Sequence, residues 1–146
     1  MKEERAEQIA EQWLTDAAES AGQKDLQAHM GMISKRISVQ GVPGFDNIDY
    51  DIWYKQCRHQ FEMSMIKSIA YKGFNLINAT ETQITFTVFE TVVGADGTLN
   101  EQIVEISLEK EDDDVWRLVT ERVLIENDAM RNHELSKEQG PDSTKN

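Results

Sequence analysis

The sequence predicts an α+β fold, a roll in which N-terminal helices cover one face of a mostly antiparallel sheet. The stretch 66–125 reads as four consecutive strands joined by short turns. In one of them Ile84, Phe86 and Val88 alternate with other residues, and this period of two gives a strand one dry face and one wetter face. The Asp-Gly pair at 96–97 is a strong hairpin signal, and short turns make neighbouring strands antiparallel.

The two strands after this hairpin have different patterns. Val104, Ile106 and Leu108 alternate with polar residues, as on a strand with one exposed face. The last strand, 115–125, is apolar on both sides, so we expect it in the middle of the sheet or in a subunit interface. The acidic turn 111–114 between these strands is expected to face water.

Helices are predicted ahead of this sheet. Residues 3–21 carry alanines and Trp13 at three- and four-residue spacing, which predicts an amphipathic helix that ends at Gly22. A shorter helix is predicted from 25 to about 33, followed by a first strand over 34–40. A third helix and the four late strands then complete the roll.

The third helix, capped by Asp49 or Asp51, is rich in aromatic side chains. Trp53, Tyr54 and Phe61 recur along it at helical spacing. Such a stripe usually packs in a core, because each ring buries a large area. Here the aromatic load exceeds what sealing a small sheet requires, so we expect some of these rings to line a ligand cavity.

Composition limits the classes of partner. The 146 residues predict one domain over 1–126, followed by a polar and flexible tail over 127–146. The formal net charge of −12 argues against nucleic acid and against anionic membrane surfaces as partners. Cys57 is the single cysteine, and no apolar run reaches the length of a membrane helix. We therefore expect a cytoplasmic protein.

No motif for a metal or cofactor is present. The three histidines and Cys57 lack metal-ligand spacing, and there is no glycine-rich loop of the kind that cradles phosphates. His29 lies on the apolar face of the second predicted helix with Leu26 and Met30, so we expect it to point inward or to the rim of a pocket. A histidine in such a place is usually a neutral core residue, and an acid–base role is the alternative.

Three segments carry a resemblance to a known family: the helix around Trp13, Asp-Leu-Gln-Ala-His-Met at 25–30, and Ser-Lys-Arg-Ile-Ser-Val-Gln-Gly at 34–41. With this order of elements, residues 5–126 resemble the nuclear transport factor 2-like superfamily in its SnoaL-like, or polyketide-cyclase-like, branch. The resemblance implies a cystatin-like cone, in which a curved sheet wraps round a helix and leaves an internal pocket. It also implies a homodimer packed through the sheet.

The resemblance leaves the function open, because the superfamily includes isomerases, dehydratases, cyclases, ligand binders and assembly modules. The catalytic aspartate of its isomerases and cyclases falls here on Gln40 or Gly41, neither of which accepts a proton. The acidic pair of the family falls on Lys35 and Arg36. Asp46 and Asp49, in the next loop, would replace the aspartate only if that loop folded inward, and we expect these loop acids to be exposed.

Three functions remain from the sequence: a protein that binds a small apolar or aromatic molecule, an enzyme, or a dimerisation and assembly module. The enzyme would be an isomerase, dehydratase or cyclase that uses His29 and Tyr54 as its acid–base pair. An open cavity with two polar groups converging on one point would favour the enzyme. The expected ligand-binding residues are mostly apolar or aromatic: Trp13, Met30, Ile33, Gln40, Trp53, Cys57, Phe61, Tyr71, Phe86, Phe89 and Trp116.

Overall fold

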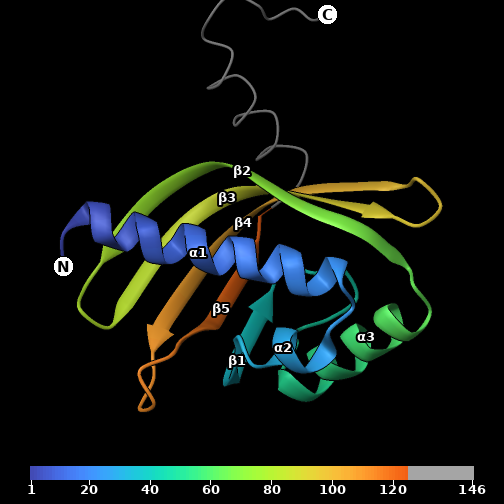
Figure 1. Cartoon of the computed structure of the whole chain (residues 1–146), viewed down its shortest axis with the longest axis horizontal. Helices are drawn as coiled ribbons and strands as arrows, with labels where there is room; N and C mark the ends of the chain where they lie inside the picture. The colour runs from blue at the N-terminus through green and yellow to red at the C-terminus, as the bar shows by residue number, and fades with distance from the viewer. Residues whose placement is uncertain (125–146) are drawn as a thin grey trace, which may run out of the picture.

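A computed structural model describes residues 1–124 and confirms the predicted α+β class (Figure 1). The predicted tail, 127–146, lies outside the described residues. The elements, in chain order, are α1 (Glu3–Gly22), α2 (Leu26–Met30), β1 (Ile33–Gln40), α3 (Tyr50–Glu62), β2 (Ile66–Ala79), β3 (Gln83–Gly94), β4 (Leu99–Lys110) and β5 (Trp116–Val123).

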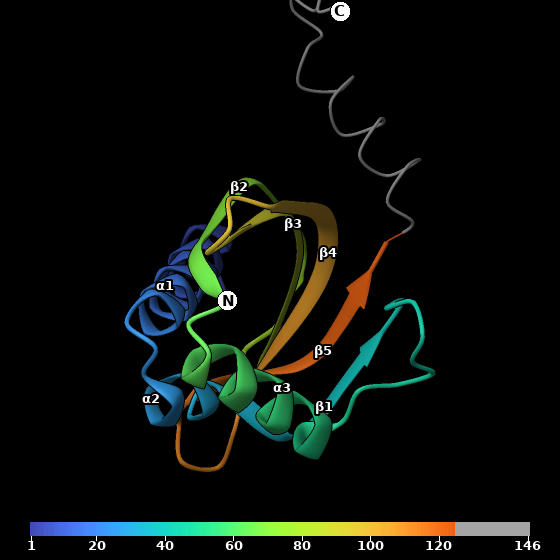
Figure 2. The same ribbon diagram turned by 90° about the vertical axis from the view of Figure 1, so that its right-hand side faces the viewer.

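The five strands form one sheet in the order β1-β5-β4-β3-β2. The four late strands pair antiparallel with their neighbours in sequence, as predicted, and β1 joins the far edge parallel to β5. Figure 2 shows that the sheet is curved and open, with the helices on its inner side. Strand β5 lies between β1 and β4, in the interior of the sheet, which is one of the two places expected for the last strand.

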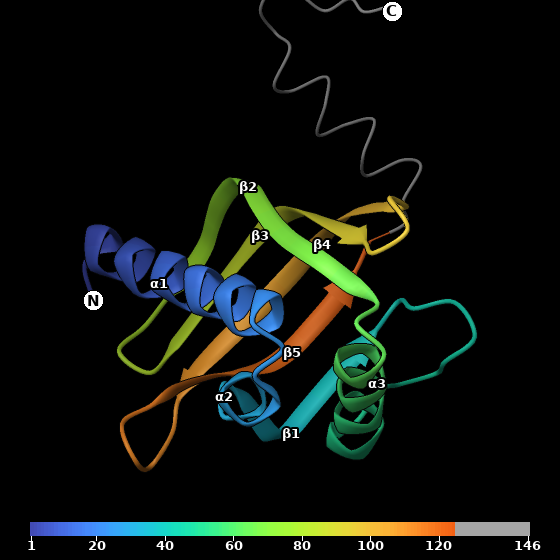
Figure 3. The same ribbon diagram turned by 45° about the vertical axis from the view of Figure 1, so that its right-hand side comes forward.

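The long edge strand β2 supplies part of this curvature. Its pairing with β3 shifts register between Lys72 and Asn75, and Gly73 in this interval has a φ of 70°. A β-bulge bends a strand and increases its twist, and glycine adopts a positive φ without the steric penalty of a Cβ. The bend carries β2 around α1, which packs along it (Figure 3).

Helix α1 approaches the sheet closely because its inner face is small. Ala6, Ala10 and Ala17 are at most 2% exposed, so the backbone of the helix lies near the strands. Trp13 adds the one large ring of this face, and its indole N–H donates a hydrogen bond to the Met32 carbonyl oxygen at 3.3 Å. The helix thus forms one wall of the interior.

The second helix is shorter than predicted, because α2 ends at Met30 rather than near residue 33. The backbone beyond Gly31 is recruited by the sheet: the Leu118 N–H donates to the Met32 carbonyl oxygen at 3.0 Å, and Ile33 pairs with Leu118. The long-range pairing of Ile33 with Leu118 therefore ends α2 one turn early, because residues beyond Gly31 join the sheet instead of continuing the helix.

The prediction that the acidic turn 111–114 faces water is wrong in part, because the side chain of Glu111 is half-buried. Its carboxylate accepts hydrogen bonds from the Ser34 hydroxyl at 2.7 Å, from Arg117 at 3.0 Å and from Arg36 at 3.1 Å. Glu111 therefore ties β1 to the turn between β4 and β5, while Asp112 stays exposed. These bonds hold the parallel edge of the sheet in register.

The cap of α3 gives a first testable prediction. The Asp49 carboxylate accepts a hydrogen bond from the Ile52 N–H at 3.0 Å and satisfies one of the free donors of the first turn. Asp49→Ala is expected to lower the free energy of unfolding by about 1 kcal/mol. Urea denaturation measures this loss, and Asp46→Ala in the exposed loop is the control expected to change little. Equal effects of the two substitutions would contradict a capping role.

Candidate functional site

A hollow of about 370 Å³ lies between the concave face of the sheet and the three helices. Its helical side is mainly apolar and aromatic, with Trp13 and Ala17 from α1 and with Trp53, Cys57 and Phe61 from α3. Its sheet side carries polar groups on four adjacent strands. These are Tyr71 on β2, Glu90 on β3, Asn100 and Gln102 on β4, and Glu121 on β5. The exposed Gln56 and Asn100 mark the side on which the hollow meets solvent.

The inward position of Glu90 follows from the period of its strand. Ile84, Phe86 and Val88 are almost completely buried on the concave face, and Glu90 is next in that row. Gln102 likewise continues inward the row of buried apolar residues on β4, and it lies directly opposite Glu90 in the register. Two apolar rows therefore end in polar side chains where the sheet reaches the hollow.

Glu90 is held by two neutral donors. Gln102 donates a hydrogen bond from Nε2 to its Oε1 at 3.0 Å, and the hydroxyl of Tyr71, its partner in the register with β2, donates a second. Burial raises the pKa of Glu90, and the bonds from Gln102 and Tyr71 oppose that rise by stabilising the carboxylate. Burial and then the negative charge of Glu90 and of Glu121 raise the pKa of Tyr71, so it acts as a donor.

Glu121 reaches the same wall from β5 through a break in strand periodicity. The pairing of β4 with β5 shifts between Leu118 and Thr120, and this β-bulge turns Glu121 to the concave face opposite Ile106. Burial, followed by repulsion from Glu90, raises the pKa of Glu121 to about 8. Within residues 1–124 its carboxyl group accepts no hydrogen bond, and its accessible surface faces the hollow.

The two carboxyl groups behave as one unit that shares a proton. Like charges close together in a poorly solvated site cannot both ionise easily, so the protons leave the pair in two separated steps. Glu90, with two hydrogen-bond donors, is the better carboxylate, and Glu121 holds the proton near neutral pH. The hollow thus carries one acid and one base on its sheet side.

His29 lines the hollow as a neutral, hydrogen-bonded group. Its Nδ1 lies 2.8 Å from the Ser20 hydroxyl, which itself donates to the Ala17 carbonyl oxygen at 3.2 Å. Because that hydroxyl hydrogen is used, we assign the ring proton to Nδ1. Burial lowers the pKa of His29 to about 4, against a smaller opposing effect of a backbone hydrogen bond with Ala17. The ring packs edge-on against Phe61, with centroids 5.7 Å apart.

Two further groups of α3 face this space. Among residues 1–124 the buried indole N–H of Trp53 has no oxygen or nitrogen acceptor, and the only group that accepts from it is the sulfur of Cys57, a weak acceptor. A poorly satisfied donor beside a cavity can be paired by a ligand. Burial raises the pKa of the Cys57 thiol to about 12, against an opposing effect of Trp53. Cys57 therefore stays a thiol and is a poor nucleophile.

The state of Cys57 gives a second prediction. Because the thiolate is the reactive form, iodoacetamide at neutral pH is expected to leave folded protein unmodified and to alkylate Cys57 after unfolding in guanidinium chloride. Mass spectrometry of the two samples measures the modification. Rapid alkylation of the folded protein, at the rate of the unfolded chain, would show that the thiol is exposed or ionised.

The hollow brings together six of the residues that the sequence singles out: Trp13, His29, Trp53, Cys57, Phe61 and Tyr71. Tyr54 is not among them and lies, with Met30 and Ile33, along a separate surface cleft. The structure therefore does not place Tyr54 beside His29. His29 on α2 faces the hollow, whereas Tyr54 on α3 faces the surface cleft.

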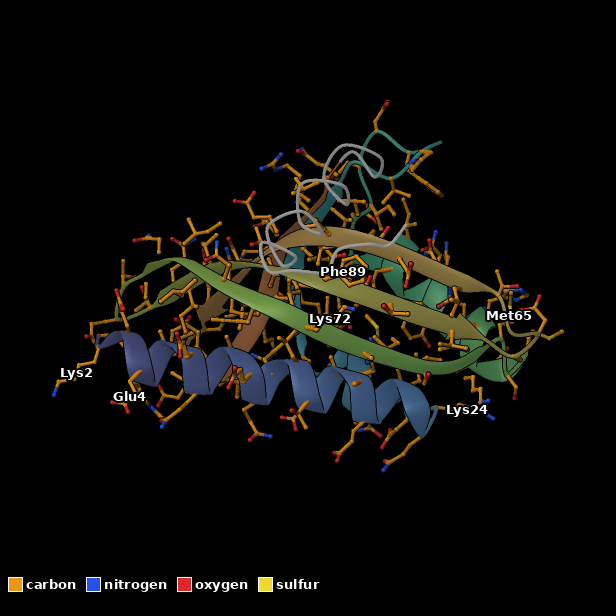
Figure 4. The ribbon with its side chains drawn as sticks, turned by 90° about the horizontal axis from the view of Figure 1, so that it is seen from above. Lys2, Glu4, Lys24, Met65, Lys72 and Phe89 are labelled. Atoms are coloured by element: carbon orange, nitrogen blue, oxygen red, sulfur yellow. The ribbon has the colours of Figure 1, made fainter. Side chains whose placement is uncertain are left out.

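The remaining candidates lie away from the hollow. Phe86 is enclosed in the core against Phe74, with ring centroids 4.9 Å apart. Phe89 lies on the outer face of the sheet, where the Lys72 ammonium is 5.0 Å from its ring centre (Figure 4). Trp116 lines a depression near the N-terminus, and Gln40 is exposed.

The backbone around Gly41, just after β1, explains why this position cannot hold an aspartate. Its φ is +89°, and a Cβ built there would collide with the carbonyl oxygen of Val123 on β5. The close approach of these two strand ends leaves no room for an aspartate. The acidic groups of the interior come instead from β3 and β5, as Glu90 and Glu121.

Within the described part of the chain, no cluster of three or more His, Cys, Asp or Glu side chains could hold a metal ion. None of the helices over residues 1–124 is long and apolar enough to cross a membrane.

Comparison with known proteins finds similarity in structure alone. No protein-family model matches the sequence, and no curated protein matches it. A protein of unknown function with a cystatin-like fold from Nostoc punctiforme is 11% identical and covers 80% of this chain and 88% of its own, with a TM-score of 0.62. A candidate dehydratase of the nuclear transport factor 2-like family from Streptomyces avermitilis is 13% identical, covers 84% and 97%, and has a TM-score of 0.62.

A candidate scytalone dehydratase from Novosphingobium aromaticivorans is 10% identical and covers 80% of each chain, with a TM-score of 0.63. The chain has the nuclear transport factor 2-like fold. This confirms, for the fold, the resemblance stated from the sequence. At sequence identities of 10–13%, the similarity to these structures shows the fold alone. The function must come from the residues of the hollow.

Proposed function

We propose that the protein binds a small molecule with a largely apolar body in the hollow, and that Glu90 and Glu121 hold its polar end. The observation that carries this proposal is an internal space with aromatic rings on one side and, on the other, the buried carboxyl groups of Glu90 and Glu121, of which Glu121 accepts no hydrogen bond within residues 1–124. Small-molecule sites have this composition, with apolar walls and a few convergent polar groups.

The size of the hollow supports a compact ligand. A volume of about 370 Å³ is at the lower end for such sites and equals that of about a dozen water molecules, at about 30 Å³ each. A ligand of roughly a dozen non-hydrogen atoms or somewhat more is therefore expected. A large fused-ring molecule would have to displace one of the helices.

Native mass spectrometry of the purified protein tests this proposal through any co-purified molecule. We expect Val92→Phe, which places a ring in the hollow, to remove the bound species. Val93→Phe is the matched control, because the adjacent residue on β3 faces the opposite side of the sheet. Equal ligand content in the two variants would place the binding site elsewhere.

A second candidate function is acid–base catalysis, as in an isomerase, dehydratase or cyclase. The geometry that favours it is the convergence of two buried carboxyl groups, Glu90 and Glu121, on a single wall, where burial raises the pKa of both. Glu90 would take a proton from the bound molecule, and Glu121 would donate one. This pair replaces the His29 and Tyr54 pair expected from the sequence, which the structure does not bring together.

Turnover of the co-purified molecule or its relatives separates an enzyme from a binder. Glu90→Gln removes the base but keeps its size, and is expected to lower the rate by about a hundredfold or more while the ligand still binds. An unchanged rate would exclude Glu90 as the base. Binding without any conversion would leave the protein a binder.

We also propose, with the resemblance as support, a place in the SnoaL-like branch, a cytoplasmic location and a homodimer packed through the sheet. The interior position of β5 accounts for its apolar residues without a partner subunit. Sedimentation at micromolar concentration tests the dimer, and a monomer there would remove that proposal.

A further inference from the structure

The charges around the hollow are unbalanced. Taken element by element, its titratable lining groups are His29 on α2, Cys57 on α3, Tyr71 on β2, Glu90 on β3 and Glu121 on β5. Helix α1 and strands β1 and β4 contribute none, and no lysine or arginine of the described chain lines the space. His29 and Cys57 are neutral near pH 7, so every ionisable group left is an acid.

Nearby cationic side chains are turned away. Arg122 follows Glu121 on β5 but extends over the outer face, where it pairs with Glu105 at 2.7 Å. Lys72 follows Tyr71 on β2 and lies over the ring of Phe89 on that same outer face. The alternation of the strands therefore keeps the carboxyl groups inside and their potential counterions outside.

The carboxyl groups also have no charged donor within residues 1–124. Glu90 receives bonds from two neutral groups, and Glu121 receives none within residues 1–124. A shared proton reduces the mutual repulsion of the two carboxyl groups. An alkylammonium group carries a full positive charge and three N–H donors, so it can replace that proton and bond both carboxylates.

The opposite wall suits the same class of ligand. Trp13, Trp53 and Phe61 present aromatic rings to the hollow, and aromatic faces attract cations as well as apolar groups. An anion would meet two acids with no cation to pair with. A neutral molecule would leave the shared proton in place and would gain no ion pair.

We infer that the hollow selects an organic cation, a primary amine with a small apolar body whose ammonium group binds between Glu90 and Glu121. This inference rests on the proposed function, and it assigns the chemical class of the ligand. Binding of the amine releases to the buffer the proton that the two carboxyl groups share.

Isothermal titration calorimetry with three matched probes tests the inference. The probes are 2-phenylethylamine, 2-phenylethanol and phenylacetate, which share one ring and differ in the charge of the polar end. Near neutral pH the amine is expected to bind at least about tenfold more tightly than the alcohol, because it alone gains charge-assisted bonds to both carboxylates. Phenylacetate is expected not to bind.

Proton release provides an independent signature. Below the pKa of about 8 at Glu121, the measured heat should vary with the ionisation enthalpy of the buffer and indicate about one proton released per amine bound. The affinity should rise with pH toward that value, while the amine itself stays charged because alkylammonium groups titrate near about 10. Binding of the alcohol should release no proton.

Substitutions locate the effect. Glu121→Gln is expected to weaken amine binding about tenfold or more, to reduce the preference for the amine over the alcohol, and to abolish proton release. Glu101→Gln is the matched control, since it removes the same charge on β4 from the outer face, one residue before Gln102. Its amine affinity should stay within about twofold of wild type, because the Glu101 charge lies on the outer face, is separated from the hollow by the sheet and is screened by solvent.

Three results would overturn the inference: alcohol binding as tight as amine binding, measurable binding of phenylacetate, or no binding of any probe. A neutral molecule found in the hollow by native mass spectrometry would overturn it as well. That last result would leave the proposed small-molecule function in place, so the two can fail separately.

Discussion

Replacing Glu121 by glutamine is expected to abolish a loss of stability that the wild-type protein undergoes between pH 6.5 and about 8. The pKa of Glu121 is raised from 4.5 to about 8 in the folded protein. In this interval the folded chain binds a proton that the unfolded chain does not, so stability falls as the pH rises. The fall in the free energy of unfolding is expected to be about 2 kcal/mol.

Below pH 6.5, the titration of His29 changes the stability of the protein in the opposite direction. The pKa of His29 is lowered from 6.5 to about 4, so the unfolded chain binds the extra proton there and stability rises with pH. The two effects oppose each other from pH 4.5 to 6.5, and above 6.5 the acids of the hollow act alone. The raised pKa of Glu90 acts in the same direction as that of Glu121.

Urea denaturation of wild type and Glu121→Gln across this interval measures the difference. The variant should be nearly flat, and above pH 8 it should be the more stable protein, because it avoids burying a second negative charge. Glu101→Gln should keep the slope of the wild type. A parallel fall in wild type and Glu121→Gln would show that Glu121 titrates as an ordinary surface acid.

Gly41→Ala is expected to be the most damaging single-atom change near the hollow, with a loss of about 3 kcal/mol in the free energy of unfolding. Two effects add at this position. The φ of +89° disfavours any residue with a Cβ, and that Cβ would meet the Val123 carbonyl oxygen. Relief of the collision must move the ends of β1 and β5 apart. Val39 pairs with Glu121 at these ends, so the wall of the hollow would move with them.

Gly44→Ala separates the two effects. Gly44 has a φ of +90°, but a Cβ there would meet nothing within 4 Å. The loss from backbone strain alone is expected to be about 1 kcal/mol. Denaturation of both variants gives the comparison. If Gly44→Ala were as destabilising as Gly41→Ala, the close packing of β1 against β5 would not be the cause.

The order of helices and strands could be predicted because each depends on local patterns that the structure preserves. Alanine and tryptophan spacing defines α1, and alternation with glycine turns defines β3 and β4. The end of α2 could not be predicted, because the pairing of Ile33 with Leu118, far along the chain, decides it. Local propensity had no access to that contact.

The acidic pair of the hollow was missed for two different reasons. Glu90 continues the apolar row of Ile84, Phe86 and Val88, so a polar residue in phase with a dry face was a signal in the sequence itself. Glu121 carried no such signal, because the β-bulge after Leu118 changes the face on which it lies. A strict period of two would have placed it on the outer side.

Carbon-13 NMR titration of glutamate side-chain carboxyl groups measures whether Glu90 and Glu121 share a proton inside the hollow. Two resonances are expected to titrate above the ordinary glutamate value of 4.5, the higher one near 8, and Glu121→Gln should remove that higher step and lower the other. If every glutamate carboxyl titrated below about 5, both groups would be solvated surface acids and the account of the hollow would be wrong.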